Sequence, residues 1–167
     1  MQWLYDELVK DNHEVIMPTL PNADHPSRNE CLNEIIKLLK DLNHKELVMI
    51  GHSLGVTSAL DYIEECNKKV LGLISVSGFH LDTGHELNSY FMKEKDIDFE
   101  KVNTNLNNKA VIYGDNDPYL TKEIREALAD ELDVDPYIIE NGGHLNESAG
   151  FSELPLITDI LNSWEIN

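Results

Sequence analysis

The chain is 167 residues long, which is the length of one domain with a sizeable core and leaves no room for a second catalytic domain. Its 31 acidic and 13 basic residues give a net charge of −18, and this charge makes nucleic acid, anionic membranes and polyphosphate surfaces poor partners. No apolar run reaches membrane-spanning length, and the first residues are charged and amphipathic rather than a signal peptide, so we expect a cytoplasmic protein.

Short β-like runs alternate with helical segments along the chain, which is typical of a mostly parallel sheet flanked by helices. Residues 13–20 ("HEVIMPTL") are predicted as the first strand, and residues 26–43 as the first full helix. Ser27 and Glu30 have the spacing of a capping box at the start of that helix. Its predicted buried stripe consists of Leu32, Ile35, Ile36, Leu39 and Leu42.

The rest of the chain continues this alternation. The run "ELVMI" predicts a strand, and a helix follows from about Leu54 to Cys66 with an apolar face. The residues of that face are Val56, Ala59, Leu60 and Ile63. Further strands are predicted at 70–78, 109–114 and 135–140. One helix is predicted to start near Thr121, and a terminal helix is predicted through Leu161 and Trp164. The sequence therefore predicts a single α/β domain over residues 1–167, a three-layer, doubly wound, mostly parallel sheet.

Two features interrupt this pattern. Residues 79–108 form a long polar connection with scattered aromatic residues, which is either a small cap over a site or a long connection. Cys31 and Cys66 both fall in predicted helices without C-x-x-C spacing, so they are interpreted as small core or boundary hydrophobes.

Polar residues with chemical potential follow three of the predicted strands. Ser53 lies in "GHSLG" directly after the strand "ELVMI", the pair Asp115 and Asp117 follows "KAVIYG", and His144 follows "DPYIIE". Because ligands bind at the carboxyl ends of the strands in a doubly wound sheet, these side chains should meet at one edge. The order serine, acid, histidine is that of an α/β-hydrolase, and G-x-S-x-G between a strand and a helix is its nucleophile elbow.

This arrangement predicts roles for each residue. Ser53 would be the nucleophile and His144 the base that accepts its proton, while Asp117 would orient the imidazole. Gly51 and Gly55 would be required because the helix passes close to the strand at a strained serine.

Each residue also has a simpler interpretation. Ser53 could be only a helix N-cap, His144 a surface loop residue, and the two aspartates the start of a turn before Pro118. His52 is expected to pack beside the elbow without a catalytic role.

The sequence gives weaker support to two other uses of its polar residues. The cluster His80, Asp82 and His85 in "FHLDTGH" could bind a metal, but it lacks the spacing of known metal motifs, so no metal and no cofactor are expected. Phosphate binding at a helix N-terminus is disfavoured by the missing P-loop pattern and by the negative charge.

The segments "WLYDELVKDNHEVIMPTLPNAD", "VMIGHSLG", "IYGDNDPYL" and "GGHLNESAGFSELPLITDIL" together resemble the small single-domain serine hydrolases related to retinoblastoma-binding protein 9 and YdeN. The resemblance extends over nearly the whole chain. It implies a Rossmann-like α/β-hydrolase core without a large lid that hydrolyses small esters or amides through an acyl-enzyme. It places the nucleophile, acid and base on Ser53, Asp117 and His144, with Asp115 as the fallback acid.

The resemblance also implies an apolar strand and a His-Gly loop before the helix that contains Trp3, and the sequence has neither. The domain is therefore expected to be truncated at its N-terminus relative to the family. The missing strand would lie between residues 13–20 and "ELVMI", which predicts weak stability, closure of the gap by direct pairing, or a strand donated by another chain.

The missing loop bears on function, because an oxyanion hole takes one N–H from Leu54 and a second from that loop. Losing one such donor costs about 2.7 to 4 kcal/mol, or roughly 100- to 1000-fold in turnover. The sequence therefore leaves two functions open. One is a serine hydrolase of carboxylesterase type, whose turnover the missing oxyanion loop would impair. The other is a catalytically weak scaffold that acts as a binding or regulatory protein. The expected partner is a small ester or amide substrate, and the sequence does not decide between a monomer and an oligomer or protein complex.

Overall fold

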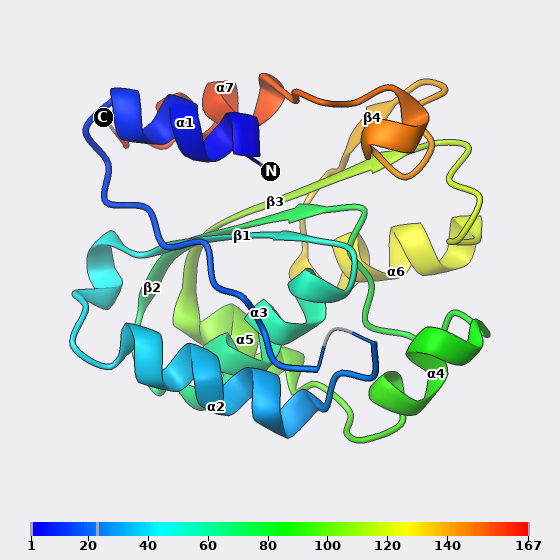
Figure 1. Ribbon diagram of the computed structural model, residues 1–167, viewed down its shortest axis with the longest axis horizontal. Helices are drawn as coiled ribbons and strands as arrows, with labels where there is room; N and C mark the ends of the chain where they lie inside the picture. Colours follow the sequence, from blue (N-terminus) through cyan, green and yellow to red (C-terminus); the bar gives the residue numbers. More distant parts are fainter. Residues whose placement is uncertain (1, 23, 167) are drawn as a thin grey trace.

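A four-stranded parallel sheet lies between two layers of helices (Figure 1). The computed structural model describes residues 2–22 and 24–166, apart from the side chain of residue 87. The strands lie in the sheet in chain order, and each neighbouring pair is parallel. They are β1 (Val48–His52), β2 (Val70–Val76), β3 (Leu106–Gly114) and β4 (Tyr137–Ile139). The predicted α/β class and three-layer architecture are confirmed, and the carboxyl ends of all four strands meet at one edge.

Alternation of side chains along the strands divides the core into two halves. Val111 and Tyr113 on β3 belong to the cluster on one face, whereas Ala110 and Ile112 belong to the cluster on the other. The first face is covered by α3 (Leu54–Glu65), α5 (Phe99–Asn105) and α6 (Lys122–Leu132), and the second by α1 (Gln2–Lys10) and α7 (Leu156–Ser163) (Figure 1). Because apolar residues occupy both faces, the sheet is buried between the layers.

Helix α2 (Arg28–Leu39) packs against α3 rather than against the sheet. Ser27 caps it as predicted, since its hydroxyl accepts a hydrogen bond from the Glu30 N–H. The predicted stripe is correct for Ile35 and Leu39, which are buried, but wrong for Ile36, which is 41% exposed. Contact with a single helix buries only a narrow face of α2, and Cys31 completes that face.

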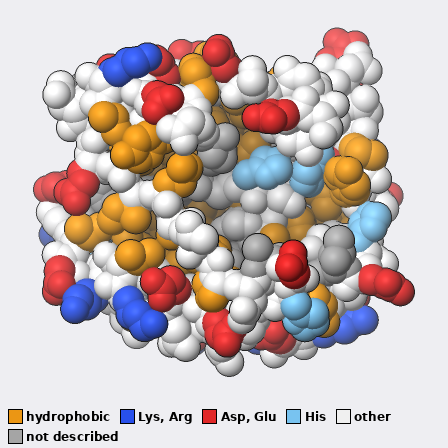
Figure 2. Space-filling view, in the orientation of Figure 1, with side chains coloured by type: hydrophobic (Ala, Val, Ile, Leu, Met, Phe, Trp, Pro, Cys, Tyr) orange, Lys and Arg blue, Asp and Glu red, His pale blue; other side chains and the backbone are white. Residues whose placement is uncertain are grey.

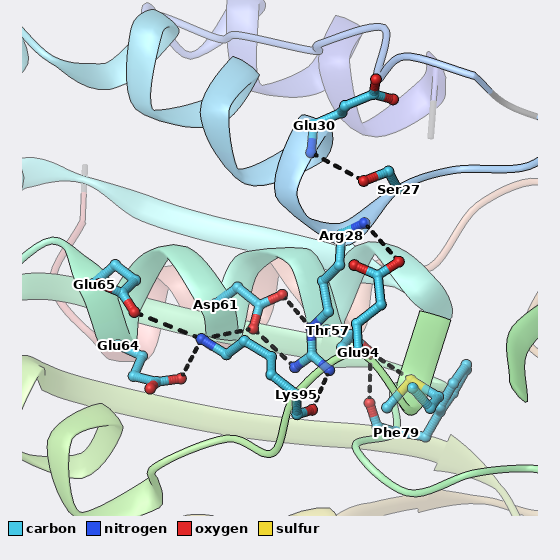
Figure 3. Close-up of polar contacts among 11 residues, drawn as sticks. Ser27, Arg28, Glu30, Thr57, Asp61, Glu64, Glu65, Phe79, Glu94 and Lys95 are labelled. Carbon is cyan, nitrogen blue, oxygen red and sulfur yellow. Dashed lines mark hydrogen bonds and ion pairs between the residues drawn. The ribbon is translucent and has the colours of Figure 1, made fainter. Parts of the chain in front are cut away.

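A buried ion pair ties α2 to α3 (Figure 3). The Arg28 guanidinium donates to both carboxylate oxygens of Asp61, at 2.6 and 2.8 Å, and also to the Lys95 carbonyl oxygen at 2.6 Å. The Lys95 ammonium lies 2.9 Å from the Glu64 carboxylate. Both Arg28 and Asp61 are almost completely buried. The pair therefore fixes α2, α3 and the connection after β2 in one arrangement.

The long connection of residues 79–108 contains α4 (Glu86–Met92) and α5. Phe79, Phe91 and Met92 are buried in one cluster, and Thr57 on α3 donates to the Phe79 carbonyl oxygen at 2.8 Å. Val102 on α5 belongs to the main core. Two short 3-10 turns, His44–Glu46 and Glu147–Ala149, complete the described elements. Within residues 2–22 and 24–166, no helix is long and apolar enough to cross a membrane.

The strand predicted at residues 13–20 is wrong, because this segment has no regular secondary structure. A strand needs a neighbour for its backbone groups, and this segment pairs with none among the described residues. The expected closure of the gap by direct pairing is therefore also wrong. Instead, a cavity of about 1040 Å³ lies between this segment and β1.

Candidate active site

Ser53 lies at a sharp turn between β1 and α3. Its backbone has φ 53° and ψ −126°, a combination that a residue with a side chain rarely adopts and that costs on the order of 1–3 kcal/mol. A Cβ atom on Gly51 would lie 2.8 Å from backbone atoms of Val56, so the predicted close approach of helix and strand is confirmed there. The same prediction is wrong for Gly55, where a Cβ atom would meet nothing within 4 Å.

The Ser53 hydroxyl does not act as a helix cap. Ser53 occupies the N-cap position of α3, but its side chain makes no capping hydrogen bond. The hydroxyl oxygen lies 3.0 Å from Nε2 of His144 instead. This geometry argues against the simple capping role that the sequence also allowed.

His144 is buried and is held on its other side by Asp117. Its Nδ1 lies 2.7 Å from Oδ2 of Asp117, and that carboxylate is buried as well. The second oxygen, Oδ1, accepts hydrogen bonds from the N–H groups of Tyr119 and Leu120, at 2.9 and 3.3 Å. Nδ1 is thus the donor in the neutral ring, which leaves Nε2 free to accept the Ser53 proton.

Two further contacts connect the loop after β3 to the loop that carries His144. Oδ1 of Asp115 accepts from the Asn141 N–H at 2.8 Å, and Oδ1 of Asn116 accepts from the Gly143 N–H at 2.7 Å. Asp115, the fallback acid, is therefore engaged with the loop backbone while Asp117 meets His144. Sequence reasoning missed Asn116, although three successive Asp or Asn residues after a strand are a signal for such side chain to backbone bonding.

Aromatic rings surround the imidazole of His144. Tyr119 packs edge-on against it at 5.0 Å between ring centroids, and His52 does so at 4.9 Å. His52 also donates from Nε2 to the His144 carbonyl oxygen at 2.9 Å, which means that it packs beside the elbow as expected. Burial lowers the pKa of His52, so its ring stays neutral beside His144 at neutral pH. His85 lies edge-on to Tyr119, at the outer side of this group.

Leu54, the predicted oxyanion donor, is the first residue of α3. The first N–H groups of a helix have no partner within the helix, so the Leu54 N–H is free to bind an oxyanion beside Ser53. The residues of the disfavoured metal cluster do not come together: Asp82 accepts from Ser89 and Gly84, and His80 packs against Phe99. In the described part of the chain, no three His, Cys, Asp or Glu side chains are grouped to hold a metal ion.

Similarity to known proteins identifies the family of the chain. The sequence model of the family described as "Serine hydrolase" matches residues 2–163. The protein named "Putative hydrolase YdeN", of Bacillus subtilis (strain 168), is 28% identical over 166 residues, covering 97% of this chain and 86% of that protein. Serine hydrolase RBBP9 of Rattus norvegicus is 30% identical over 113 residues, 66% of this chain and 58% of the rat protein.

The fold leads to the same relatives. The crystal structure of the ydeN gene product from B. subtilis has a TM-score of 0.89 at 25% identity, and the match covers 99% of this chain and 90% of that one. The chain therefore belongs to the serine hydrolase family, and it is a hydrolase with the α/β-hydrolase fold that resembles YdeN and RBBP9.

Proposed function

We propose that the chain hydrolyses small carboxylic esters or amides by acyl transfer, with Ser53 as nucleophile, His144 as general base and Asp117 as the residue that orients His144. The observation that carries the proposal is the continuous chain of contacts from Ser53 Oγ to His144 Nε2, at 3.0 Å, and from His144 Nδ1 to Asp117, at 2.7 Å. Both distances allow hydrogen bonds suited to proton transfer.

The reaction follows from these contacts. Nε2 of His144 takes the Ser53 proton as Oγ attacks the substrate carbonyl carbon, and the carbonyl electrons move to oxygen. As that oxygen re-forms its double bond, the bond to the leaving group breaks, and His144 gives its proton to the departing alcohol or amine. Water then attacks the acyl-serine by the same route and releases the acid. Asp117 stabilises the positive imidazolium in both halves of the reaction.

The oxyanion formed in both steps requires donors. The Leu54 N–H supplies one, and its place next to Ser53 at the start of α3 adds the favourable end of the helix dipole. The charge of −18 favours neutral over anionic substrates, because carboxylates and phosphates would be repelled on approach. Tyr119, which is half-exposed against His144, supplies an apolar wall for an acyl or alcohol group.

A catalytically weak scaffold is the second candidate function. The observation that favours it is the open space beside Gly55, where the cavity along β1 reaches the turn that carries Ser53. Water in that space would weaken every electrostatic interaction at the oxyanion. Such a protein would react once with an activated ester but turn over slowly.

A fluorophosphonate probe and an activated-ester assay test both candidates. We expect the wild-type chain to be labelled, Ser53→Ala to lose labelling and about 10⁶-fold in turnover, and Ser152→Ala, at an exposed serine, to match the wild type. Equal labelling of Ser53→Ala and wild type would refute the assignment. Stoichiometric labelling of the wild type without turnover above background would favour the weak scaffold.

A further inference from the structure

The chain contains two arginines, Arg28 and Arg125, and both are buried. Arg28 pairs with the carboxylate of Asp61 (Figure 3), whereas Arg125, on α6, forms no ion pair with any Asp or Glu of the described residues. On the face shown in Figure 2, the Lys and Arg side chains lie near the margins, close to acidic side chains. A buried guanidinium without a carboxylate is costly unless other groups accept its hydrogen bonds.

The Arg125 guanidinium bridges the two ends of the loop that carries Asp117. Nη1 donates to the Leu120 carbonyl oxygen and Nη2 donates to the Asp115 carbonyl oxygen, both at 2.6 Å. Nε is buried and has no partner among the described residues. The guanidinium carbon also lies over the ring of Tyr113, at the end of β3, 5.8 Å from the ring centroid. Arg125 therefore holds the loop between β3 and α6 closed at both ends.

The closed loop in turn fixes the carboxylate of Asp117. Its Oδ1 accepts from the N–H groups of Tyr119 and Leu120, and its Oδ2 lies 2.7 Å from Nδ1 of His144. Leu120 thus bonds to Asp117 through its N–H and to Arg125 through its carbonyl oxygen. A single residue therefore links the guanidinium to the carboxylate that meets His144.

We propose that Arg125 is a positioning residue of the hydrolase, which ties Asp115 to Leu120 and thereby keeps the Asp117 carboxylate in place against His144. The inference rests on the proposed function for the roles of Asp117 and His144.

The chemistry of arginine suits this task. A guanidinium presents N–H groups from several nitrogens in one rigid plane, so it can bind two carbonyl oxygens at once, whereas the ammonium of lysine is a single point of charge. If Arg125 only filled space between α6 and β3, methionine would serve almost as well, because its flexible apolar side chain adapts to such gaps. Methionine cannot donate to the Asp115 and Leu120 carbonyl oxygens, so the two explanations predict different kinetics.

Ester-hydrolysis kinetics of Arg125→Met test the inference. We expect kcat to fall about 10- to 100-fold while KM changes less than about twofold, because a catalytic group displaced by about 1 Å can cost about 100-fold in rate without weakening substrate binding. Arg125→Lys can reach only one of the two carbonyl oxygens, so its kcat should lie between those of Arg125→Met and the wild type. The matched control is Lys122→Met, which removes an exposed cation from the same helix and should match the wild type.

The proton between His144 Nδ1 and Asp117 provides a second measurement that requires no turnover. In a short hydrogen bond to a carboxylate, such a proton resonates far downfield in the NMR spectrum. We expect this resonance in the wild type, in Ser53→Ala and in Lys122→Met, and we expect it to be shifted or lost in Arg125→Met. Because Ser53→Ala abolishes turnover and keeps this hydrogen bond, a failure of the proposed function and a failure of the present inference give different results.

Circular dichroism verifies that the variants are folded, and Arg125→Lys carries both measurements if Arg125→Met does not fold. Wild-type kcat in the folded variant would overturn the inference. A lowered kcat with an unchanged resonance would overturn it as well, because the hydrogen bond between Asp117 and His144 would then not depend on Arg125.

Discussion

The loops that hold His144 and the segment of residues 14–21 differ in how their backbones are bonded to the rest of the chain. In the loops, Asp115, Asn116 and Asp117 each bond to the segment from Asn141 to His144. By contrast, residues 14–21 make no backbone hydrogen bond to another described residue.

This difference shows how the candidate site is stabilised. The position of His144 relative to Ser53 depends on bonds between loops after β3 and β4, and the position of Ser53 depends on β2 and α3. None of these hydrogen bonds involves residues 14–21.

The largest expected effect separates the two aspartates of these loops. Asp117→Asn removes the charge that orients and stabilises His144, and we expect turnover to fall about 10⁴-fold with little change in folding. Asp115→Asn retains an oxygen that can accept from the Asn141 N–H, so it should lose less than about tenfold. Ester-hydrolysis kinetics of both variants measure this difference. A larger loss of turnover in Asp115→Asn than in Asp117→Asn would show that the role of orienting His144 is assigned to the wrong aspartate.

The next effect concerns the buried ion pair between α2 and α3. Asp61→Ala leaves the Arg28 guanidinium buried without its carboxylate and should lower the free energy of unfolding by about 3–5 kcal/mol. The double variant Arg28→Met, Asp61→Leu removes both charges and should recover most of that loss. Urea unfolding of the three proteins measures it. A double variant as unstable as Asp61→Ala would contradict the ion-pair explanation and indicate a packing defect.

A smaller effect tests whether the loop bonds position His144. Asn116→Ala leaves the Gly143 N–H without its acceptor, which costs about 1–3 kcal/mol and should lower kcat about 10- to 100-fold while KM changes little. Asn116→Asp keeps the acceptor and should restore most of kcat. If the alanine and aspartate variants have the same kcat, the bond is structural only.

The smallest effect is the acid sensitivity of two half-buried histidines, His52 at the end of β1 and His80 after β2. Burial lowers the pKa of His52 and of His80 below the ordinary value of 6.5. Below about pH 6.5 these rings bind protons in the unfolded chain before they do in the folded one, so stability falls with acidification by up to about 1.4 kcal/mol per pH unit for each ring. Urea unfolding between about pH 7.5 and 5.5 should show a flatter profile for His80→Gln than for the wild type. Parallel profiles would exclude a contribution from His80.

The sequence alone predicted much of the fold because its signals are local. Apolar runs of strand length predicted all four strands of the sheet within a few residues, and the Ser27 cap predicted the start of α2. The errors arose where a neighbour decides the outcome. Residues 13–20 have strand composition but no strand beside them, and Ile36 has a helical spacing that only a second packing partner would bury.

For the candidate site, the sequence determined which residue types follow which strands. Ser53, Asp117 and His144 could be placed at one edge because the carboxyl ends of parallel strands necessarily coincide. The sequence favoured Asp117 over Asp115, and the tertiary structure shows the hydrogen bond of Asp117 to His144, because the turn after β3 directs the two side chains differently. The tertiary structure alone decided that Gly55 faces open space and that residues 13–20 do not pair with β1, because distances between segments far apart in the chain are set by packing and leave no local signal in the sequence.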